Sequence, residues 1–95
     1  MLTLNMVPTN QSGVVGRIVD NEAVLVLPEK GKIKVLNEVG ARIWSLVDGK
    51  RSIGQIAAAI CDEYQVDLPV AEADSLAFIA ELAERGVVTV APKPA

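Results

Sequence analysis

The chain has 95 residues, of which 51% are hydrophobic and 3% aromatic, so it predicts one small domain with an aliphatic core. It carries 9 Lys and Arg against 12 Asp and Glu, with one Cys and no His. These counts exclude a disulfide framework within the chain. They also remove the His side chains on which most general-base catalysis and transition-metal sites depend.

The first residues, MLTLNMVPTNQSG, show neither a basic segment nor an apolar run, so they do not have the pattern of a secretion signal. No stretch approaches the ~18 apolar residues of a membrane-spanning helix. We therefore expect a cytoplasmic protein that crosses no membrane, and a single Cys suits a reducing compartment. Composition predicts a flexible arm over residues 1–13, one domain over residues 14–90 and a flexible tail over residues 91–95.

Residues 14–36 predict a meander of three antiparallel strands. VVGRIV (14–19) is rich in β-branched residues, and EAVLVL (22–27) is apolar almost throughout, so we expect it to be the central strand, covered on both faces. PEKG (28–31) predicts a hairpin loop that leads into KIKVL (32–36). Charged and apolar residues alternate in this third strand, so we expect its lysines to face outward at the edge of the sheet.

Three helices are predicted to follow. Asn37 is a suitable N-cap for the first, which we expect to end at Gly49. Ser52 opens a capping box for the second, and the third runs from Pro69 to Arg85. The order predicts a small α+β domain of winged helix-turn-helix type, in which a three-stranded antiparallel sheet is followed by three helices. A short extended piece is expected at VVTV (87–90).

The third predicted helix is apolar on two sides. The face with the bulkiest side chains is the expected core contact. It holds Ala71, Ser75, Phe78, Ile79 and Leu82. The opposite face indicates either a helix buried on two sides and rich in alanine, or the floor of a groove for an apolar partner segment. It holds Ala73, Leu76, Ala80 and Ala83.

The residues do not favour catalysis or DNA binding. The chain contains no Ser/His/Asp or Cys/His set and no phosphate-binding loop motif, so we do not expect an enzyme. A winged helix-turn-helix would place its last helix in the major groove. Here that helix is acidic, and it would be repelled by phosphates. Its charged residues are Glu72, Asp74, Glu81 and Glu84 against Arg85. The lysines that remain to contact phosphate are Lys30, Lys32 and Lys34.

Two long stretches resemble one family. VLNEVGARIWSLVDGKRSIGQIAAAICDEYQVD, followed by AEADSLAFIAELAERGVV, is similar to the PqqD-like proteins. The similarity covers residues 14–90. It depends on the order and spacing of several features: a strand that runs into Leu36-Asn37, a helix that ends at Asp48-Gly49, a second helix from Ser52, and an acidic third helix closed by Arg85-Gly86-Val87.

The resemblance implies a function without catalysis and without a cofactor. Members bind the leader of a ribosomally made precursor peptide and present it to a modifying enzyme. That enzyme is a radical-SAM protein, as in pyrroloquinoline quinone biosynthesis, or the leader peptidase of a lasso-peptide pathway. The leader adds a strand beside the third strand and lies against the third helix. Carried onto this chain, the strand positions are Lys32, Ile33, Lys34, Val35 and Leu36. The helix positions that we nominate are Asp74, Leu76, Ala77, Ala80, Glu81 and Glu84.

Elementary physics agrees with this reading. An edge strand offers unpaired N–H and C=O groups that an extended peptide can satisfy. Lys32 and Lys34 would attract acidic leader residues, and the helix acids would attract basic ones. Two alternatives stay open at this point. One is a winged-helix regulator that binds DNA, and the other is a module that pairs its free edge with a second copy to form a homodimer.

Overall fold

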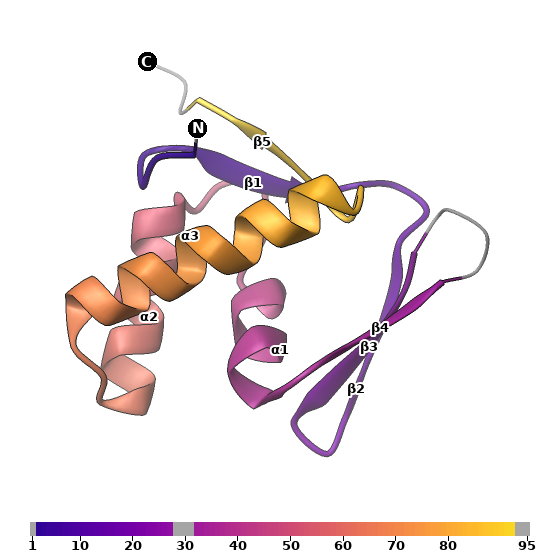
Figure 1. Cartoon of the computed structure of the whole chain (residues 1–95), viewed down its shortest axis with the longest axis horizontal. Helices are drawn as coiled ribbons and strands as arrows, with labels where there is room; N and C mark the ends of the chain where they lie inside the picture. The colour runs from indigo at the N-terminus through magenta and orange to yellow at the C-terminus, as the bar shows by residue number, and fades with distance from the viewer. Residues whose placement is uncertain (1, 28–31, 93–95) are drawn as a thin grey trace.

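The computed structural model describes residues 2–27 and 32–92 of the chain (Figure 1). The predicted α+β order of three paired strands followed by three helices is confirmed, and two further strands lie outside it. The elements are β1 (Val7–Asn10), β2 (Val15–Val19), β3 (Glu22–Val26), β4 (Ile33–Leu36), α1 (Glu38–Ser45), α2 (Ile53–Tyr64), α3 (Leu68–Glu84) and β5 (Val88–Ala91). The predicted PEKG loop, with Lys30, lies outside the described residues.

The larger sheet has the order β2-β3-β4, and all its pairs are antiparallel. Asp20 and Asn21 join β2 to β3 with φ angles of 51° and 68°. Two consecutive positive φ values are the geometry of a tight hairpin turn, in which Asp and Asn are favoured. β3 is therefore central, as predicted, and β4 lies at an edge of this sheet.

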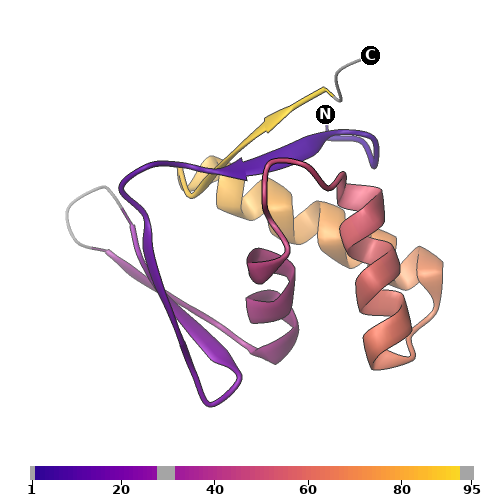
Figure 2. The same ribbon diagram turned by 180° about the vertical axis from the view of Figure 1, so that it is seen from behind.

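The prediction that β3 is covered on both faces is wrong. Ala23 and Leu25 are fully buried, but Val24 is only half-buried and Val26 is 39% exposed. The three helices lie on one side of the β2-β3-β4 sheet, which Figures 1 and 2 show nearly edge-on. Period-two alternation therefore divides an apolar strand into a buried side and an exposed side.

The prediction that the lysines of the third strand face outward is wrong for Lys34. Lys34 is in register with the buried Leu25, so its side chain points to the helix side, while Ile33 and Val35 are 65% and 62% exposed. The reason lies at Leu36, which is 2% exposed and joins the core. Because side chains alternate along a strand, burying Leu36 places Lys34 on the same inner side.

The structure also corrects the expectation of a flexible arm over residues 1–13. Val7–Asn10 form β1, which pairs antiparallel with β5, and both Val7 and Pro8 are buried. Just before β1, the carbonyl of Met6 accepts a hydrogen bond of 2.9 Å from the amide of Ile53. The extended piece predicted near residues 87–90 is confirmed as β5, which includes Ala91 from the expected tail.

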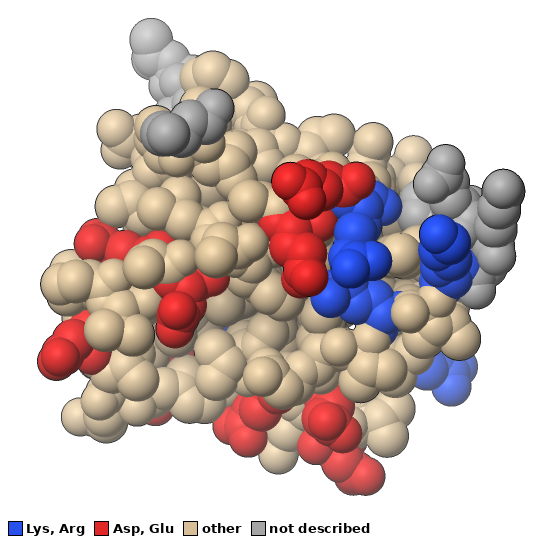
Figure 3. Space-filling model, viewed as in Figure 1, with Lys and Arg blue, Asp and Glu red and all other residues tan. Residues whose placement is uncertain are grey.

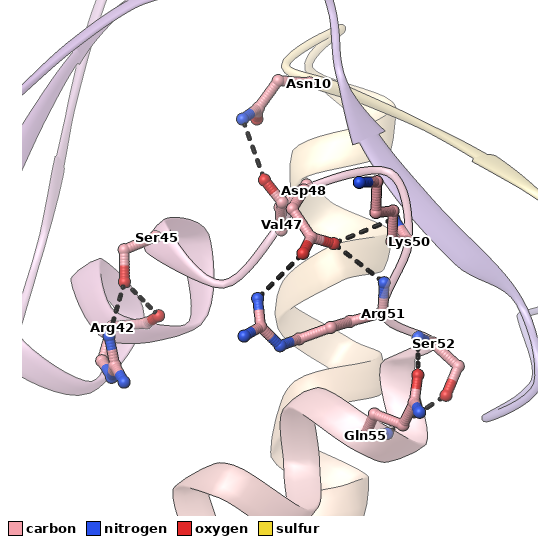
Figure 4. A network of polar contacts seen from close by, with 9 residues as sticks. All are labelled: Asn10, Arg42, Ser45, Val47, Asp48, Lys50, Arg51, Ser52 and Gln55. Carbon is pink, nitrogen blue, oxygen red and sulfur yellow. Dashed lines mark hydrogen bonds and ion pairs between the residues drawn. The ribbon is translucent and has the colours of Figure 1, made fainter.

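The helix-start signals work as the sequence predicts. The Asn37 side chain accepts from the amide of Gly40 at 2.9 Å, and Ser52 and Gln55 form the reciprocal capping box (Figure 4). α1 ends at Ser45, before the expected end at Gly49. The next two residues, Leu46 and Val47, are still buried, each at 5% exposure. Between α1 and α2 the chain turns at Gly49, whose φ is 76°.

The core lies where α2 and α3 pack together and where α1 packs against β3 and β4 on the inner face of the sheet. Its largest fully buried side chains include Leu25, Ile53, Ile56, Ile79 and Leu82. In the described part of the chain, no helix combines the length and the hydropathy that a membrane crossing requires.

Candidate functional site

A groove of about 740 Å³ lies between the end of β4 and the middle of α3. The first turns of α1 form its base, because α1 starts directly after β4 and holds the strand and α3 together. β4 and the residue after it contribute Lys34, Val35, Leu36 and Asn37. α1 contributes Val39, Gly40 and Ile43, and α3 contributes Asp74, Ala77, Phe78 and Glu81.

The base of the groove depends on a glycine. A Cβ atom at Gly40 would lie 3.1 Å from Cε1 and 3.2 Å from Cζ of Phe78, which is closer than ordinary van der Waals contact. The missing side chain lets α3 approach α1, and it leaves the Phe78 ring half-buried beside Ile43. The surface beneath the polar mouth of the groove is therefore aliphatic and aromatic.

An ion pair crosses the groove from strand to helix. The ammonium of Lys34 lies 3.1 Å from Oε2 of Glu81, and the side chains are 18% and 43% exposed. Arg85 lies 3.9 Å from the other oxygen of Glu81. Figure 3 shows acidic side chains over the C-terminal half of α3 next to basic side chains over β4. A partly exposed pair of this kind is worth about 0–1 kcal/mol. Lys34 is therefore paired within the chain, and the pair can be exchanged at low cost.

The outer edge of β4 carries backbone groups without a strand partner. The amide of Leu27 donates to the carbonyl of Lys32 at 2.7 Å, which fixes the phase of the β3-β4 ladder. Because such pairs alternate in an antiparallel ladder, Lys34 bonds to β3, whereas the N–H and C=O of Ile33 and Val35 point away from it. Among the described strands, none pairs with that edge of β4.

The structure brings together about half of the residues that the sequence nominates. On the strand, Lys32 and Ile33 precede the groove, and on α3 the nominated Leu76, Ala80 and Glu84 do not line it. The nominated residues that line the groove are Lys34, Val35, Leu36, Asp74, Ala77 and Glu81.

The second apolar face of α3 is not the floor of the groove. Leu76 and Ala83 from that face pack partly against the core. The face that lines the groove follows helical spacing through Asp74, Ala77, Phe78 and Glu81. Phe78, which the sequence places in the core, lies at the border between the buried stripe and this face.

Five lining residues were missed by the sequence reasoning. Four of them belong to the chain that directly follows β4, and the signal for them was the N-cap at Asn37, which starts a helix at the end of β4. The five are Asn37, Val39, Gly40, Ile43 and Phe78.

The groove is lined by aliphatic, aromatic and charged side chains. The groups with shifted pKa values lie on α1, on α2 and in the connection between these helices. The pKa of Glu63 is lowered by a hydrogen bond from Arg42, and burial raises the pKa of Tyr64. No cluster of three potential metal ligands occurs in residues 2–27 and 32–92.

Comparison with known proteins places the chain in a family. A family model described as coenzyme PQQ synthesis protein D (PqqD) matches residues 22–88. The chain is similar to the solved structure of TbiB1 in complex with the TbiA(beta) leader peptide, with a TM-score of 0.77 and 36% identity over 84% of this chain and 93% of that one. It is also similar to lasso peptide synthetase B1 complexed with the leader peptide, with a TM-score of 0.76 and 24% identity over 86% and 96% of the two chains.

A third similar structure is the PqqD truncation of Methylobacterium extorquens PqqCD, described as a functional and stand-alone RiPP recognition element. Its TM-score is 0.73, with 33% identity over 87% of this chain and 88% of that one. A search of curated proteins found no match. The family model spans more than half of the chain, and two of these structures exceed 30% identity. The resemblance read from the sequence is confirmed, and the chain belongs to the PqqD family.

Proposed function

We propose that this chain is a non-catalytic recognition protein that binds the leader of a ribosomally made precursor peptide. The leader adds a strand to the open edge of β4 and is then offered to a modifying enzyme. The observation that carries the proposal is the free edge of β4 beside an apolar groove on α3. Two similar proteins were solved in complex with leader peptides, which supports it.

The geometry suits strand addition. The outward N–H and C=O groups of Ile33 and Val35 would bond to the guest backbone, and alternate guest side chains would enter the groove toward Phe78 and Ile43. Ordering a flexible peptide costs about 2–5 kcal/mol. Apolar guest side chains against the base of the groove offset that cost, while Asp74 and Glu81 favour basic guest residues at the mouth.

The partner enzyme and the compartment are part of the proposal. A radical-SAM enzyme fits the match to PqqD, and a leader peptidase fits the similarity to a lasso peptide synthetase component. Both would act in the cytoplasm, where precursor peptides are made. No cofactor is required of this chain, because recognition uses only its backbone edge and its groove.

DNA binding is not supported. The third helix, which would enter the major groove in a winged-helix regulator, instead presents Asp74 and Glu81 beside β4. Carboxylates there would repel phosphate groups. The family match to a coenzyme synthesis protein also points away from gene regulation.

A proline at position 35 tests the strand addition. V35P removes an N–H that points to the free edge, and it leaves the bonds from Lys34 to β3 in place. We expect calorimetric titration with the leader of the cognate precursor peptide to show at least ~10-fold weaker binding, which corresponds to the loss of one well-made hydrogen bond. V35A keeps the N–H and should bind within a few-fold of the wild type.

Circular dichroism provides the folding control for both variants. If V35P and V35A, both folded, bind the leader equally well, the peptide does not use this edge of β4. The strand-addition model would then be wrong.

A further inference from the structure

The side of the β2-β3-β4 sheet that faces away from the helices is apolar, and its side chains are exposed. We call it the outer face, and most of its side chains are β-branched and exposed. Five of them have exposed fractions of 61%, 52%, 39%, 65% and 62%, namely Val15, Val19, Val26, Ile33 and Val35. Val24 lies among them, half-buried. No described element packs on this side (Figures 1 and 2). Isolated exposed apolar residues are ordinary, whereas a contiguous patch marks an interaction surface.

The outer face also carries one charge of each sign. Arg17 is in register with Val24, and Glu22 lies two residues before Val24 on β3. Strands lie ~4.8 Å apart, and alternate residues along a strand lie ~6.8 Å apart. Arg17 and Glu22 therefore lie at similar distances from Val24. Arg17 lies across the strands and Glu22 lies along β3, so the two directions are nearly perpendicular.

This placement makes the outer face complementary to itself in one arrangement. If two copies packed face to face with nearly parallel strand axes, a two-fold axis would put Arg17 on Arg17 or Glu22 on Glu22. If the strands crossed near a right angle about Val24, Arg17 would lie over Glu22 of the partner subunit, and the reverse pair would form as well. Val35 would then cover Val26 of the partner subunit, and the two copies of Ile33 would meet. Orthogonal packing is one of the two common ways in which sheets stack.

We propose that the outer face is a self-association surface, on which a second copy of this chain packs about a two-fold axis with crossed strands. A face of three short strands is narrower than the ~800 Å² that each partner buries in a standard interface, so the dimer should be weak. It leaves the groove open except at Val35, which both surfaces share, because Lys34 and Glu81 of the groove lie on the helix side of the sheet. It also leaves the free edge of β4 open, because the outward N–H and C=O groups lie in the plane of the sheet.

Leader binding should strengthen this dimer, a step that rests on the proposed function. A leader added along β4 becomes a fourth strand of the same sheet. Alternate leader side chains would then emerge on the outer face and widen it. Recognition of the peptide would thus favour pairing of two loaded copies.

Exchanging the charges tests the proposal without any peptide. Sedimentation equilibrium of the full chain should show association that rises with concentration. R17E and E22R should each weaken it at least several-fold, because each face then carries charges of one sign. An equimolar mixture of R17E and E22R should restore it, because an acidic face then meets a basic one. V70E, a change of another exposed valine on α3, should leave association unchanged.

Three results would overturn the proposal. One is a chain that stays monomeric at every concentration, which is also the result expected if the modifying enzyme binds the outer face instead of a second copy. Another is a mixture that associates no better than its separate variants. The last is a dimer that V35P abolishes and the charge variants do not touch, which would show pairing through the β4 edge. Failure of the leader to tighten a dimer that forms without peptide would contradict only the coupling to the proposed function.

Discussion

Asp48 shows how a single side chain shapes the connection between α1 and α2. One carboxylate oxygen accepts from the amides of Lys50 and Arg51 at 2.9 and 2.8 Å, and the other lies 2.9 Å from the Arg51 guanidinium (Figure 4). These bonds favour the ionised acid. The pKa of Asp48 is therefore lowered, with the amide of Arg51 as the largest cause and that of Lys50 next.

Acid should weaken the fold partly through this residue. Because the folded pKa of Asp48 lies below its unfolded value of ~3.9, its contribution is complete above that value and is lost as pH falls through the folded pKa. In urea titrations at neutral pH and at acid pH, D48N should be less stable at neutral pH and should lose less stability on acidification than the wild type. The pKa of Glu63 is also lowered, by Arg42, so E63Q should remove a separate part of the acid sensitivity. If D48N keeps the full acid response, Asp48 does not contribute in this way.

Single residues also show where sequence reasoning stops. The helix caps were predicted because their signals are local: Asn37 and Ser52 act on backbone groups three residues away. Phe78 was assigned to the core because a helical wheel cannot define the width of a buried stripe. Gly40 on α1 has no side chain, and this leaves room for the Phe78 ring at the base of the groove.

At the scale of elements, β1 is the part that the sequence did not predict. VPTN is short, and it contains a proline, which is tolerated in a two-stranded pair but argues against a strand in isolation. Its partner β5 lies some eighty residues later in the chain, at Val88–Ala91. A pairing over such a distance leaves no pattern in the neighbouring sequence. The polar composition of the segment therefore led to the prediction of a flexible arm.

Substitutions within β1 test whether this pairing supports the domain. Val7 is 7% exposed, and Thr9 on the same strand is exposed. V7D would bury an unpaired carboxylate, and we expect it to lower the free energy of unfolding by about 3 kcal/mol or more in urea titrations. T9D should change it by less than about 0.5 kcal/mol. Equal stability of the two variants would mean that β1 contributes nothing and that the arm reading of residues 1–13 was right.

The strands of the larger sheet were located correctly, but two of them were assigned the wrong faces. In KIKVL the lysines lie on one side of the strand, and Ile33 and Val35 lie on the other. No signal within these residues decides which of the two sides faces the core. The decision comes from Leu36, which enters the core as the chain turns into α1. The same reversal exposes Ile33 and Val35 and creates the outer face.

At the scale of the whole molecule, the candidate site exists only because distant segments meet. β4 and α3 are about forty residues apart, and α1 holds them on either side of the groove. The family resemblance predicted this meeting, whereas periodicity alone left the groove face of α3 unassigned. Six of the eleven nominated residues line the groove. Lys32 and Ile33 precede it on the strand, and Leu76, Ala80 and Glu84 are turned away from the groove face, because successive residues of a helix are rotated by about 100°.

Hydrogen exchange followed by NMR tests the central claim, strand addition at β4, most directly. In the free protein, the amides of Ile33 and Val35 point to the open edge and should exchange fast, whereas those of Lys34 and Leu36 are bonded to β3 and should be protected. Saturation with the leader of the cognate precursor peptide should slow exchange at Ile33 and Val35 and change little at Lys34 and Leu36. Leader binding that leaves Ile33 and Val35 as fast as before, or that protects the edge of β2 instead, would contradict the account.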